Sequence, residues 1–181
     1  FAVTGLGIEH NGPDFLAVGD LDGDGYMEIV AGNTVYNHDC SLRFQSTAYD
    51  GYPAVADIYD VWGNPTLDGT PEIIIVGYGN VTIISSTDGT ILWGPEPIPG
   101  GQNKGGAPVV ADFDGDGHPE IGTAGGAYMI VYDPHDATPI LWQQPTKDTS
   151  SAITGCTVFD FEADGAAEII YTDECFVYIY S

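Results

Sequence analysis

Basic residues are almost absent from this sequence. Its 181 residues include 3 Lys and Arg against 27 Asp and Glu, which gives a formal net charge of −24 at pH 7 with neutral histidine. A surface of this sign repels phosphate backbones and anionic lipid headgroups. The charge therefore argues against nucleic acid and anionic membranes as partners.

Long apolar runs are missing as well. No stretch approaches the roughly 20 apolar residues that cross a bilayer, and no basic-then-apolar signal segment opens the chain. We therefore expect no membrane insertion. The first residue is Phe1 rather than Met, so we expect a mature or trimmed product.

Cysteine is scarce and odd in number. Cys40, Cys156 and Cys175 cannot all pair within one chain. Cys156 and Cys175 flank one expected strand–loop–strand unit, which makes them the candidate disulfide, with three free buried thiols as the alternative. Cys40 is expected in a turn, either unpaired or paired with another chain.

Apolar and turn-forming residues, in contrast, are abundant. Hydrophobic residues make up 43% of the chain and aromatic residues 12%, so the acidity is not that of a disordered tail. The 25 Gly and 12 Pro suit many short strands joined by tight turns and argue against helices. We expect an all-β fold.

The sequence contains one repeated unit, which occurs four times. It is an apolar strand followed by an acidic loop and a second apolar strand. The glutamates that close the loops, Glu28, Glu72, Glu120 and Glu168, are 44, 48 and 48 residues apart. The flanking runs are short and rich in β-branched residues, which predicts buried strands. These runs are Phe15–Val18 and Glu28–Ala31, Pro53–Ala56 and Glu72–Val76, Pro108–Ala111 and Glu120–Ala124, and Cys156–Phe159 and Glu168–Tyr171.

The strands that follow indicate the architecture. A third strand is expected at Val81–Ile84, Tyr128–Tyr132 and Phe176–Tyr180, and a fourth that ends in Leu92-Trp93 or Leu141-Trp142. Four strands in about 45 residues are typical of a propeller blade. We predict one all-β propeller domain, residues 1–181, of about four four-stranded antiparallel blades, with approximate bounds 1–44, 45–99, 100–150 and 151–181.

The blade count leaves two arrangements open. Phe1–Val3 lies 19 residues before the first acidic loop, where an outer strand is expected to end. Either this segment completes the last blade and closes a small four-bladed ring, or the chain is a section of a larger propeller. The second arrangement is our preferred interpretation.

The acidic loops point to a cation. Carboxylates at positions 1, 3, 5 and 9 of a nine-residue loop repel one another unless a positive charge lies among them. Oxygen ligands without Cys or His side chains favour Ca²⁺ over Mg²⁺ or Zn²⁺, and glycine at position 6 allows the turn that presents a main-chain carbonyl at position 7. A single such loop is usually a solvated turn, but four copies in register argue for binding. An EF-hand is excluded, because position 12 holds Ala31, Thr123 and Tyr171 instead of glutamate.

The pattern Asp-x-Asp-x-Asp-Gly-x-x-Glu between strands resembles the FG-GAP or VCBS repeats of integrin-α-like propellers, over nearly the whole chain. In that family the loop binds Ca²⁺ between two strands of a blade, which implies three to four Ca²⁺ ions here. The implied ligands are Asp20, Asp22, Asp24, Tyr26 and Glu28 in loop 1; Asp57, Asp68, Thr70 and Glu72 in loop 2; Asp112, Asp114, Asp116, His118 and Glu120 in loop 3; and Asp160, Glu162, Asp164, Ala166 and Glu168 in loop 4.

Loops 2 and 4 depart from the pattern. Loop 2 has seven extra residues between Asp57 and Asp68, so that Thr66, Asp60 or Asn64 must supply the missing oxygen. Loop 4 carries the longer Glu162 at position 3, and weaker binding is expected there.

The resemblance implies a recognition scaffold rather than a catalyst. We expect no enzymatic activity and a secreted, cell-surface or periplasmic protein for binding, adhesion or assembly. Its partner would be a protein or glycan ligand, or copies of itself. The alternatives are a subunit of an extracellular filament or matrix, a glycan-binding lectin, and a polysaccharide-active enzyme. The enzyme needs an acid and base outside the loops, where acids such as Glu9, Asp50, Glu96 and Asp133 form no motif.

Two further features have more than one interpretation. Asn80 begins an Asn-Val-Thr sequon and is a glycosylation candidate. Trp93 and Trp142 occupy matching places in the repeat, so we expect them to pack between blades rather than stack on sugars.

Overall fold

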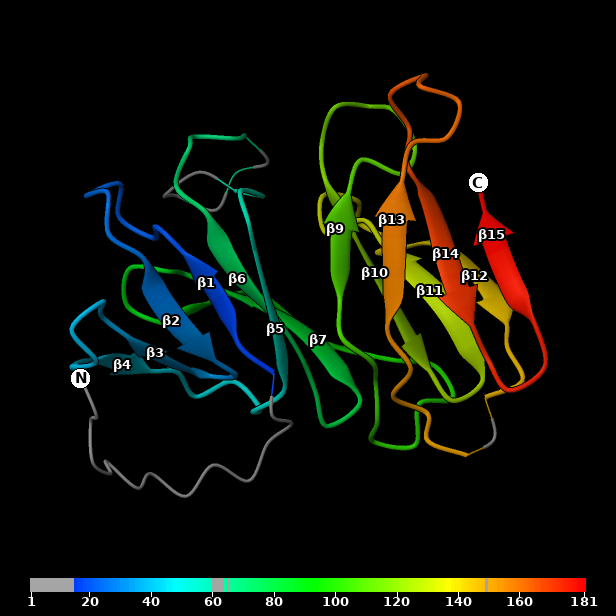
Figure 1. The fold of residues 1–181 in the computed structure, drawn as a ribbon, viewed down its shortest axis with the longest axis horizontal. Coiled ribbons are helices and arrows are strands. Elements are labelled where there is room, and N and C mark those ends of the chain that lie inside the picture. The colour runs from blue at the N-terminus through cyan, green and yellow to red at the C-terminus, as the bar shows by residue number, and fades with distance from the viewer. Residues whose placement is uncertain (1–14, 60–63, 65, 149) are drawn as a thin grey trace.

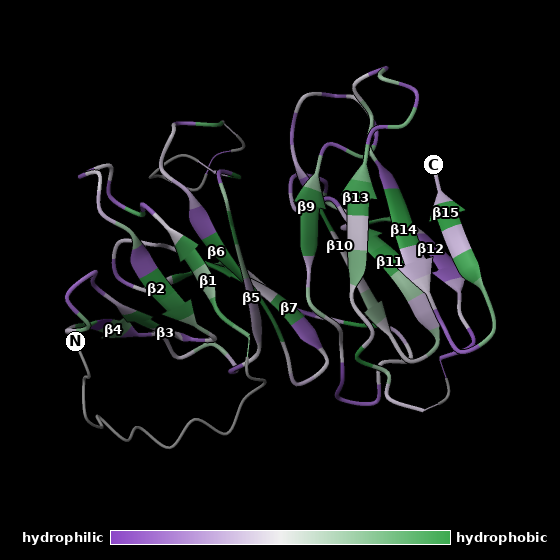
Figure 2. Ribbon diagram, in the orientation of Figure 1, coloured by the Kyte–Doolittle hydropathy of each residue, from purple (hydrophilic) through white to green (hydrophobic). Residues whose placement is uncertain are grey.

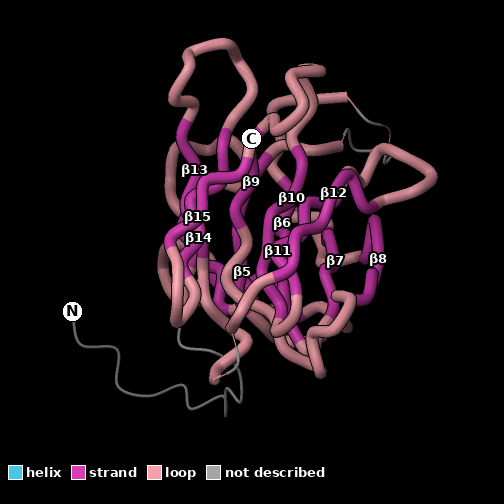
Figure 3. Tube along the Cα trace, turned by 90° about the vertical axis from the view of Figure 1, so that its right-hand side faces the viewer, coloured by secondary structure: helices cyan, strands magenta, loops and turns pink. Residues whose placement is uncertain are grey.

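The computed structural model describes residues 15–59, 64, 66–148 and 150–181. In these ranges the chain forms four antiparallel sheets in sequence order, and Figure 3 shows strands and loops without a helix. The elements are β1 (Ala17–Gly19), β2 (Glu28–Ala31), β3 (Thr34–Tyr36) and β4 (Leu42–Gln45) in sheet 1; β5 (Tyr52–Ala56), β6 (Glu72–Gly77), β7 (Asn80–Ile84) and β8 (Ile91–Pro97) in sheet 2; β9 (Val109–Ala111), β10 (Glu120–Gly125), β11 (Tyr128–Tyr132) and β12 (Ile140–Pro145) in sheet 3; and β13 (Cys156–Phe159), β14 (Glu168–Thr172) and β15 (Val177–Tyr180) in sheet 4.

The sheets are arranged as propeller blades. Each is a meander whose first strand lies at one edge, and the first strands contact one another along the row, β1 with β5, β5 with β9, and β9 with β13. The predicted all-β fold of antiparallel blades is confirmed. Sheets 1 and 4 lie at opposite ends of an open row (Figure 1), so the described sheets do not close a four-bladed ring. Phe1–Val3, which that ring required, lies outside the described residues.

The fourth strands differ from the prediction. We expected them to end at Leu92-Trp93 and Leu141-Trp142, but β8 and β12 begin at Ile91 and Ile140 and run on to Pro97 and Pro145. The residues after each tryptophan, Gly94-Pro95-Glu96-Pro97 and Gln143-Gln144-Pro145, are glycine, proline and polar residues, and they hid this extension. They belong to an outer edge strand, where one face meets water and apolar periodicity is lost.

The core lies between the sheets, because alternate residues of a strand point to opposite faces. In β6, Ile73 and Ile75 pack toward sheet 1, while Ile74 and Val76 pack toward sheet 3. Figure 2 shows the hydrophobic residues concentrated on the strands. Strands buried on both faces explain why the sequence reads as continuous apolar runs instead of an alternation.

The two tryptophans at matching places in the repeat lie between sheets, as predicted. The Trp93 ring of sheet 2 meets Tyr132 of sheet 3 at a centroid distance of 6.2 Å. The Trp142 ring of sheet 3 meets Tyr180 of sheet 4 at 5.6 Å. These rings are therefore part of the packing between neighbouring sheets.

The packing brings all four acidic loops to one end of the molecule. Each connects the first strand of a sheet to its second strand, and all four lie along the upper edge in Figure 1. The described part of the chain has no helix with the length and apolarity that a bilayer crossing demands.

Candidate metal centres

The four acidic loops share one set of hydrogen bonds from backbone N–H groups to aspartate side chains. At position 1, the aspartate Oδ2 accepts the N–H of the position 6 glycine. The donor–acceptor distance is 2.9 Å in loop 1, 2.7 Å in loop 2, 2.8 Å in loop 3 and 3.1 Å in loop 4. At position 5, the aspartate Oδ1 accepts the N–H of position 7 at 2.8, 2.8, 2.8 and 3.1 Å in the same order. Loop 2 keeps these bonds despite its insertion.

The position 6 glycines adopt a backbone conformation that other residues avoid. Gly25, Gly69, Gly117 and Gly165 have φ values of 88°, 85°, 90° and 100°. A Cβ atom at any of the four would meet nothing within 4 Å. The glycine is therefore required by the left-handed turn and not by lack of space.

The closing glutamates are the buried part of each loop. Glu28, Glu72, Glu120 and Glu168 are 2, 4, 1 and 5% exposed, and the Oε2 of each accepts the N–H of position 2, at distances between 2.6 and 2.9 Å. Within the described ranges none of the four forms an ion pair with a basic side chain. A buried carboxylate without a positive partner is costly, so each of these groups suits a cation.

Loop 3 gathers the most ligands. One carboxylate oxygen from each of Asp112, Asp114, Asp116 and Glu120 lies within 4.8 Å of the others. All the donors are oxygen atoms, which hard divalent cations prefer. This donor set fits the metal that the sequence pattern predicted, and the three aspartates and Glu120 are the residues that would hold it.

The electrostatics of loop 3 agree with this arrangement. Burial raises the pKa of Glu120 to about 7, and the nearby carboxylates of Asp114, Asp112 and Asp116 add to the rise, while the hydrogen bond from the Phe113 N–H opposes it. Burial likewise raises the pKa of Glu72 in loop 2. Among the described residues, no basic side chain pairs with the carboxylates of loop 3 or with Glu72 of loop 2.

Loop 1 brings together three of its four carboxylates. Asp20, Asp22 and Glu28 have oxygen atoms within 4.8 Å of one another, and Asp24 is not part of this group. Arg43, on β4, donates from Nη1 to Asp22 Oδ2 at 2.8 Å. This hydrogen bond lowers the pKa of Asp22. Sequence reasoning missed Arg43, because its contact with the loop is made only when β4 folds back across sheet 1.

Loops 2 and 4 form no group of three carboxylates as close as these in the described part of the chain. In loop 4 the neighbouring Glu168 raises the pKa of Glu162, which places two glutamates near each other at that site. In loop 2 the Thr66 N–H donates to the Asn64 carbonyl at 2.8 Å. Asp60, the third candidate ligand, lies outside the described residues.

The predicted disulfide is not present. All three cysteines are free, and Cys156 lies opposite Tyr171 in the β13–β14 register. Cys175 is exposed in the following turn, where its N–H donates to Asp173 Oδ1 at 2.8 Å. The prediction was wrong because the register brings Tyr171, not the turn, next to Cys156. Burial raises the pKa of the Cys156 thiol to about 12.

The remaining candidate is Asn80, the sequon residue. It begins β7, and its side-chain Nδ2 donates to the Tyr78 carbonyl at 2.9 Å. It directly follows the Tyr78-Gly79 turn between β6 and β7, so the expected hairpin turn is present but Asn80 lies at its end. Glycosylation itself stays a prediction.

Comparison with known proteins identifies the repeats. Residues 13–55 match the model of the FG-GAP repeat, and residues 66–123 match the model of an FG-GAP-like repeat. No curated protein matches the chain. Among solved structures, the chain is similar to rhamnogalacturonan lyase YesW, with a TM-score of 0.55 and 17% identity. The match covers 87% of this chain and 39% of that protein, and at this identity it bears on the fold alone.

Proposed function

Because the chain belongs to the FG-GAP repeat family, we propose that it is a calcium-stabilised, non-catalytic binding module of the β-propeller type. The observation that carries the proposal is the set of four buried glutamates, each at the end of an acidic loop and none with a basic partner in the described residues. Bound Ca²⁺ would supply the missing positive charge.

The stabilising effect follows from where the ligands lie. Each loop joins two strands of one sheet, and in loops 1 and 3 the carboxylates converge when both strands are in place. An ion that binds the folded chain and not the unfolded chain stabilises it by about 2.7 kcal/mol per site at a hundredfold excess over Kd. The ions are therefore proposed as structural staples, with the ligand bound elsewhere.

Thermal unfolding tests this role. Melting should be followed in Ca²⁺, in Mg²⁺ and in excess EDTA, and we expect a Ca²⁺-specific rise in Tm. Loops that are only solvated turns would give the same Tm in all three solutions, and that result would overturn the proposal.

A pair of matched variants assigns the effect to the loops. Asp116 and Asp136 are both exposed, and each accepts the N–H two residues ahead, at 2.8 Å and 3.2 Å. Asparagine preserves that local bond in both places. Asp116→Asn should reduce the Ca²⁺-dependent rise in Tm, whereas Asp136→Asn should leave it unchanged. Equal effects of the two variants would show that the response is not made by loop 3.

An extracellular location is part of the proposal. Weak, exposed Ca²⁺ sites are filled where the free ion is millimolar, as it is outside cells. Asp114, Asp116, Asp22 and Asp24 are exposed, which supports sites of this kind. Loop 3 should have a Kd for Ca²⁺ of about 10⁻⁴ to 10⁻³ M; isothermal titration yielding nanomolar affinity would contradict the placement.

The competing candidate is a polysaccharide-active enzyme. The structural neighbour is named a rhamnogalacturonan lyase, but this chain spans 39% of its length, and the activity belongs to that protein. The measurement is ultraviolet absorbance of unsaturated products after incubation with rhamnogalacturonan and Ca²⁺. We expect no product above the level of buffer alone, and product formation would replace the non-catalytic proposal.

A further inference from the structure

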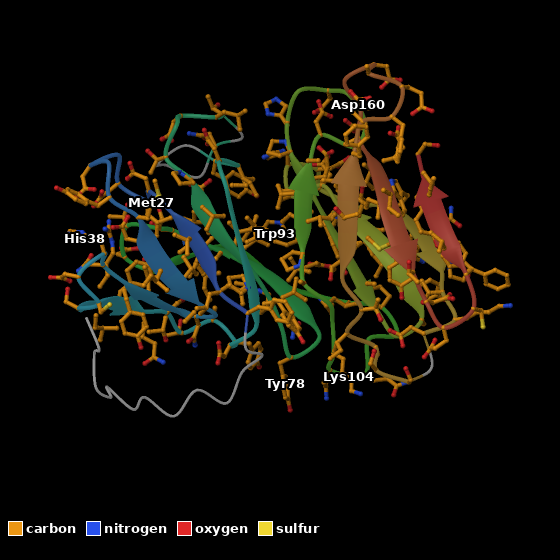
Figure 4. The ribbon with its side chains drawn as sticks, in the orientation of Figure 1. Met27, His38, Tyr78, Trp93, Lys104 and Asp160 are labelled. Atoms are coloured by element: carbon orange, nitrogen blue, oxygen red, sulfur yellow. The ribbon has the colours of Figure 1, made fainter. Side chains whose placement is uncertain are left out.

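A shallow hollow lies at the end of the sheets opposite the acidic loops. Its volume is about 360 Å³, within the range of small-molecule sites. In Figure 4, Tyr78 and Lys104 project from this end and Asp160 from the other. The residues that line it include Asp50, Tyr52, Tyr78, Asn103, Lys104 and Ile153.

The hollow exists because two backbone segments touch at its floor. A Cβ atom on Gly51 would collide with the Val76 carbonyl oxygen, and one on Gly77 with the Asp50 carbonyl oxygen. Neither position can therefore accommodate a side chain that would fill the space. The floor is built by the packing of the loop before β5 against the end of β6.

Two stacked tyrosines stand at the rim of this hollow. The rings of Tyr49 and Tyr78 have centroids 5.2 Å apart and an interplanar angle of 30°. Tyr78 is 61% exposed and Tyr49 50%. Tyr49 covers one face of the Tyr78 ring and restrains it, so the outer face of Tyr78 is a flat apolar surface that a ligand can meet at low entropic cost. Such a surface suits a flat ligand with an apolar face.

The backbone around the hollow is strained. Tyr78 has φ of 52°, although glycine, which prefers this region, occurs on both sides of it. Gln102, Asn103 and Ala152 also have positive φ, so that four of the six such non-glycine residues among those described lie in loops at this end. Strain that the surrounding structure maintains is concentrated at functional sites.

Polar groups lie beside the aromatic surface. Lys104 Nζ donates to the Ser151 carbonyl at 3.1 Å, which leaves two of its three N–H donors for other acceptors. Asn103, which is exposed, precedes it. Lys104 also borders a second hollow of about 500 Å³. Lys104 is therefore placed to contact a ligand that occupies either hollow.

The charge around the hollow selects a neutral ligand. One carboxylate, Asp50, and one ammonium, Lys104, line it, and Asp50 Oδ1 already accepts the N–H groups of Asn33 and Gly51 at 3.2 and 3.0 Å. The net charge of −24 repels polyanions. A ligand with an apolar ring face and uncharged hydroxyl groups matches the aromatic pair and the polar rim together.

We propose that this hollow binds a neutral glycan, with the face of one pyranose ring on the outer face of Tyr78, which Tyr49 supports from behind, and hydroxyl groups on Asn103 and Lys104. The inference rests on the proposed function, since it gives the binding module a ligand class. The calcium loops lie at the other end of the sheets (Figure 4), so the two proposals can fail separately.

Isothermal titration in Ca²⁺ tests the site. The probes are hexasaccharides of β-1,4-linked glucose, mannose, xylose and galactose, with a galacturonic acid hexasaccharide as the anionic probe. At least one neutral probe should bind. Tyr78→Gly removes the ring and suits the positive φ, so the variant should fold and should lower the affinity at least tenfold.

A second aromatic pair provides the matched control. Phe159 is 60% exposed, and its ring lies 5.1 Å from that of Phe161, but it lines no part of the hollow. Phe159→Ala should leave the affinity unchanged. The proposal is overturned if no neutral probe binds, if only the galacturonic acid probe binds, or if Tyr78→Gly and Phe159→Ala have equal effects. A normal Ca²⁺-dependent rise in Tm alongside any of these results would leave the proposed function standing.

Discussion

Loop 1 and loop 3 carry the same residue type at every carboxylate position, yet the two loops differ in their surroundings. Four carboxylates converge in loop 3 and three in loop 1, and Arg43 binds Asp22 in loop 1 alone. The β-bulges account for the arginine contact. Between the residues that pair with the third strand, β4 has Arg43 where β8 has Leu92 and β12 has Leu141. A single outer-strand residue thus offsets part of the negative charge of loop 1.

The largest effect should come from the first aspartate of each loop. Asp112→Ala removes a ligand and the acceptor of the Gly115 and Gly117 N–H groups. It should lower the free energy of unfolding in Ca²⁺ by about 3 kcal/mol, and by less in EDTA. Asp20→Ala should cost less in Ca²⁺, because Arg43 already offsets part of the charge of loop 1. Urea denaturation with and without Ca²⁺ measures both, and equal losses would remove the distinction between the loops.

Replacing Arg43 should make loop 1 behave like loop 3. Arg43→Leu installs the residue found at this position in sheets 2 and 3, and it releases Asp22 for the ion. We expect Ca²⁺ to bind loop 1 about tenfold more tightly, which is about 1.4 kcal/mol. Conversely, Leu141→Arg should weaken the binding of Ca²⁺ to loop 3. Calorimetric Ca²⁺ titration measures the change. As a control, Lys147→Leu removes one positive charge at the opposite end of the molecule. If it raised the Ca²⁺ affinity as much as Arg43→Leu, the effect would come from net charge and not from the Arg43–Asp22 contact.

Position 4 distinguishes loop 4 from loops 1 and 3. Ala163 has φ of 54°, where Gly23 and Gly115 have 74° and 78°. Ala163→Gly should stabilise the protein by about 0.5–1 kcal/mol, and Gly115→Ala should destabilise it by a similar amount. A Cβ atom added at Gly115 would lie 3.8 Å from the Ala166 Cβ, an ordinary contact. Chemical denaturation in EDTA isolates the backbone effect, and shifts of the same sign would contradict it.

The smallest effect is expected at Asp173, a carboxylate that the protein's own hydrogen-bond donors stabilise without a cation. Burial pushes the pKa of Asp173 upward, but N–H donors from Cys175, Lys147 and Phe176 and the Tyr178 hydroxyl outweigh it and bring the pKa to about 2, below the usual 3.8. A depressed pKa stabilises the fold above pH 3.8, and this stabilisation is lost as pH falls toward 2.

In the presence of EDTA, the fall in Tm between about pH 4 and pH 2 should therefore be smaller for Asp173→Asn than for the parent protein. The comparison of Tm with the parent protein at each pH removes the contribution of the other acids. A parallel pH profile for the two proteins would show that Asp173 does not titrate with unfolding.

The prediction of the fold succeeded because its signals are local. The runs before and after each loop predicted β5, β6, β9, β10, β13 and β14 within a few residues, since β-branched residues buried on both faces leave a plain apolar pattern. Strands β3 and β4 had no such signal. They contain Thr34, Tyr36, Arg43 and Gln45 among their seven residues. The pairing of β3 with β2 and of β4 with β3 defines them instead.

The carboxylates of loop 3 that the structure brings together were predicted from the sequence, but the geometry of the loops was not. The nine-residue spacing was enough to predict that Asp112, Asp114, Asp116 and Glu120 converge, because they lie within eight positions of one another; their role as metal ligands stays a prediction. In loop 2 the insertion separates Asp57 from Asp68 in the sequence, yet the Asp68 and Gly69 N–H groups donate to Asp57 at 3.3 and 2.7 Å. Only the folded loop shows that the extra residues leave this turn intact.

The sequence alone determined the repeat, the all-β class and the acidic loops, because each depends on residues close together in the chain. Tertiary structure decided which loop meets a basic side chain, which cysteines fail to meet, and where Tyr49 and Tyr78 stack. These outcomes depend on strand register and on the packing of one sheet against the next. They are set by contacts between distant residues, and residue spacing in a single sequence does not encode those distances.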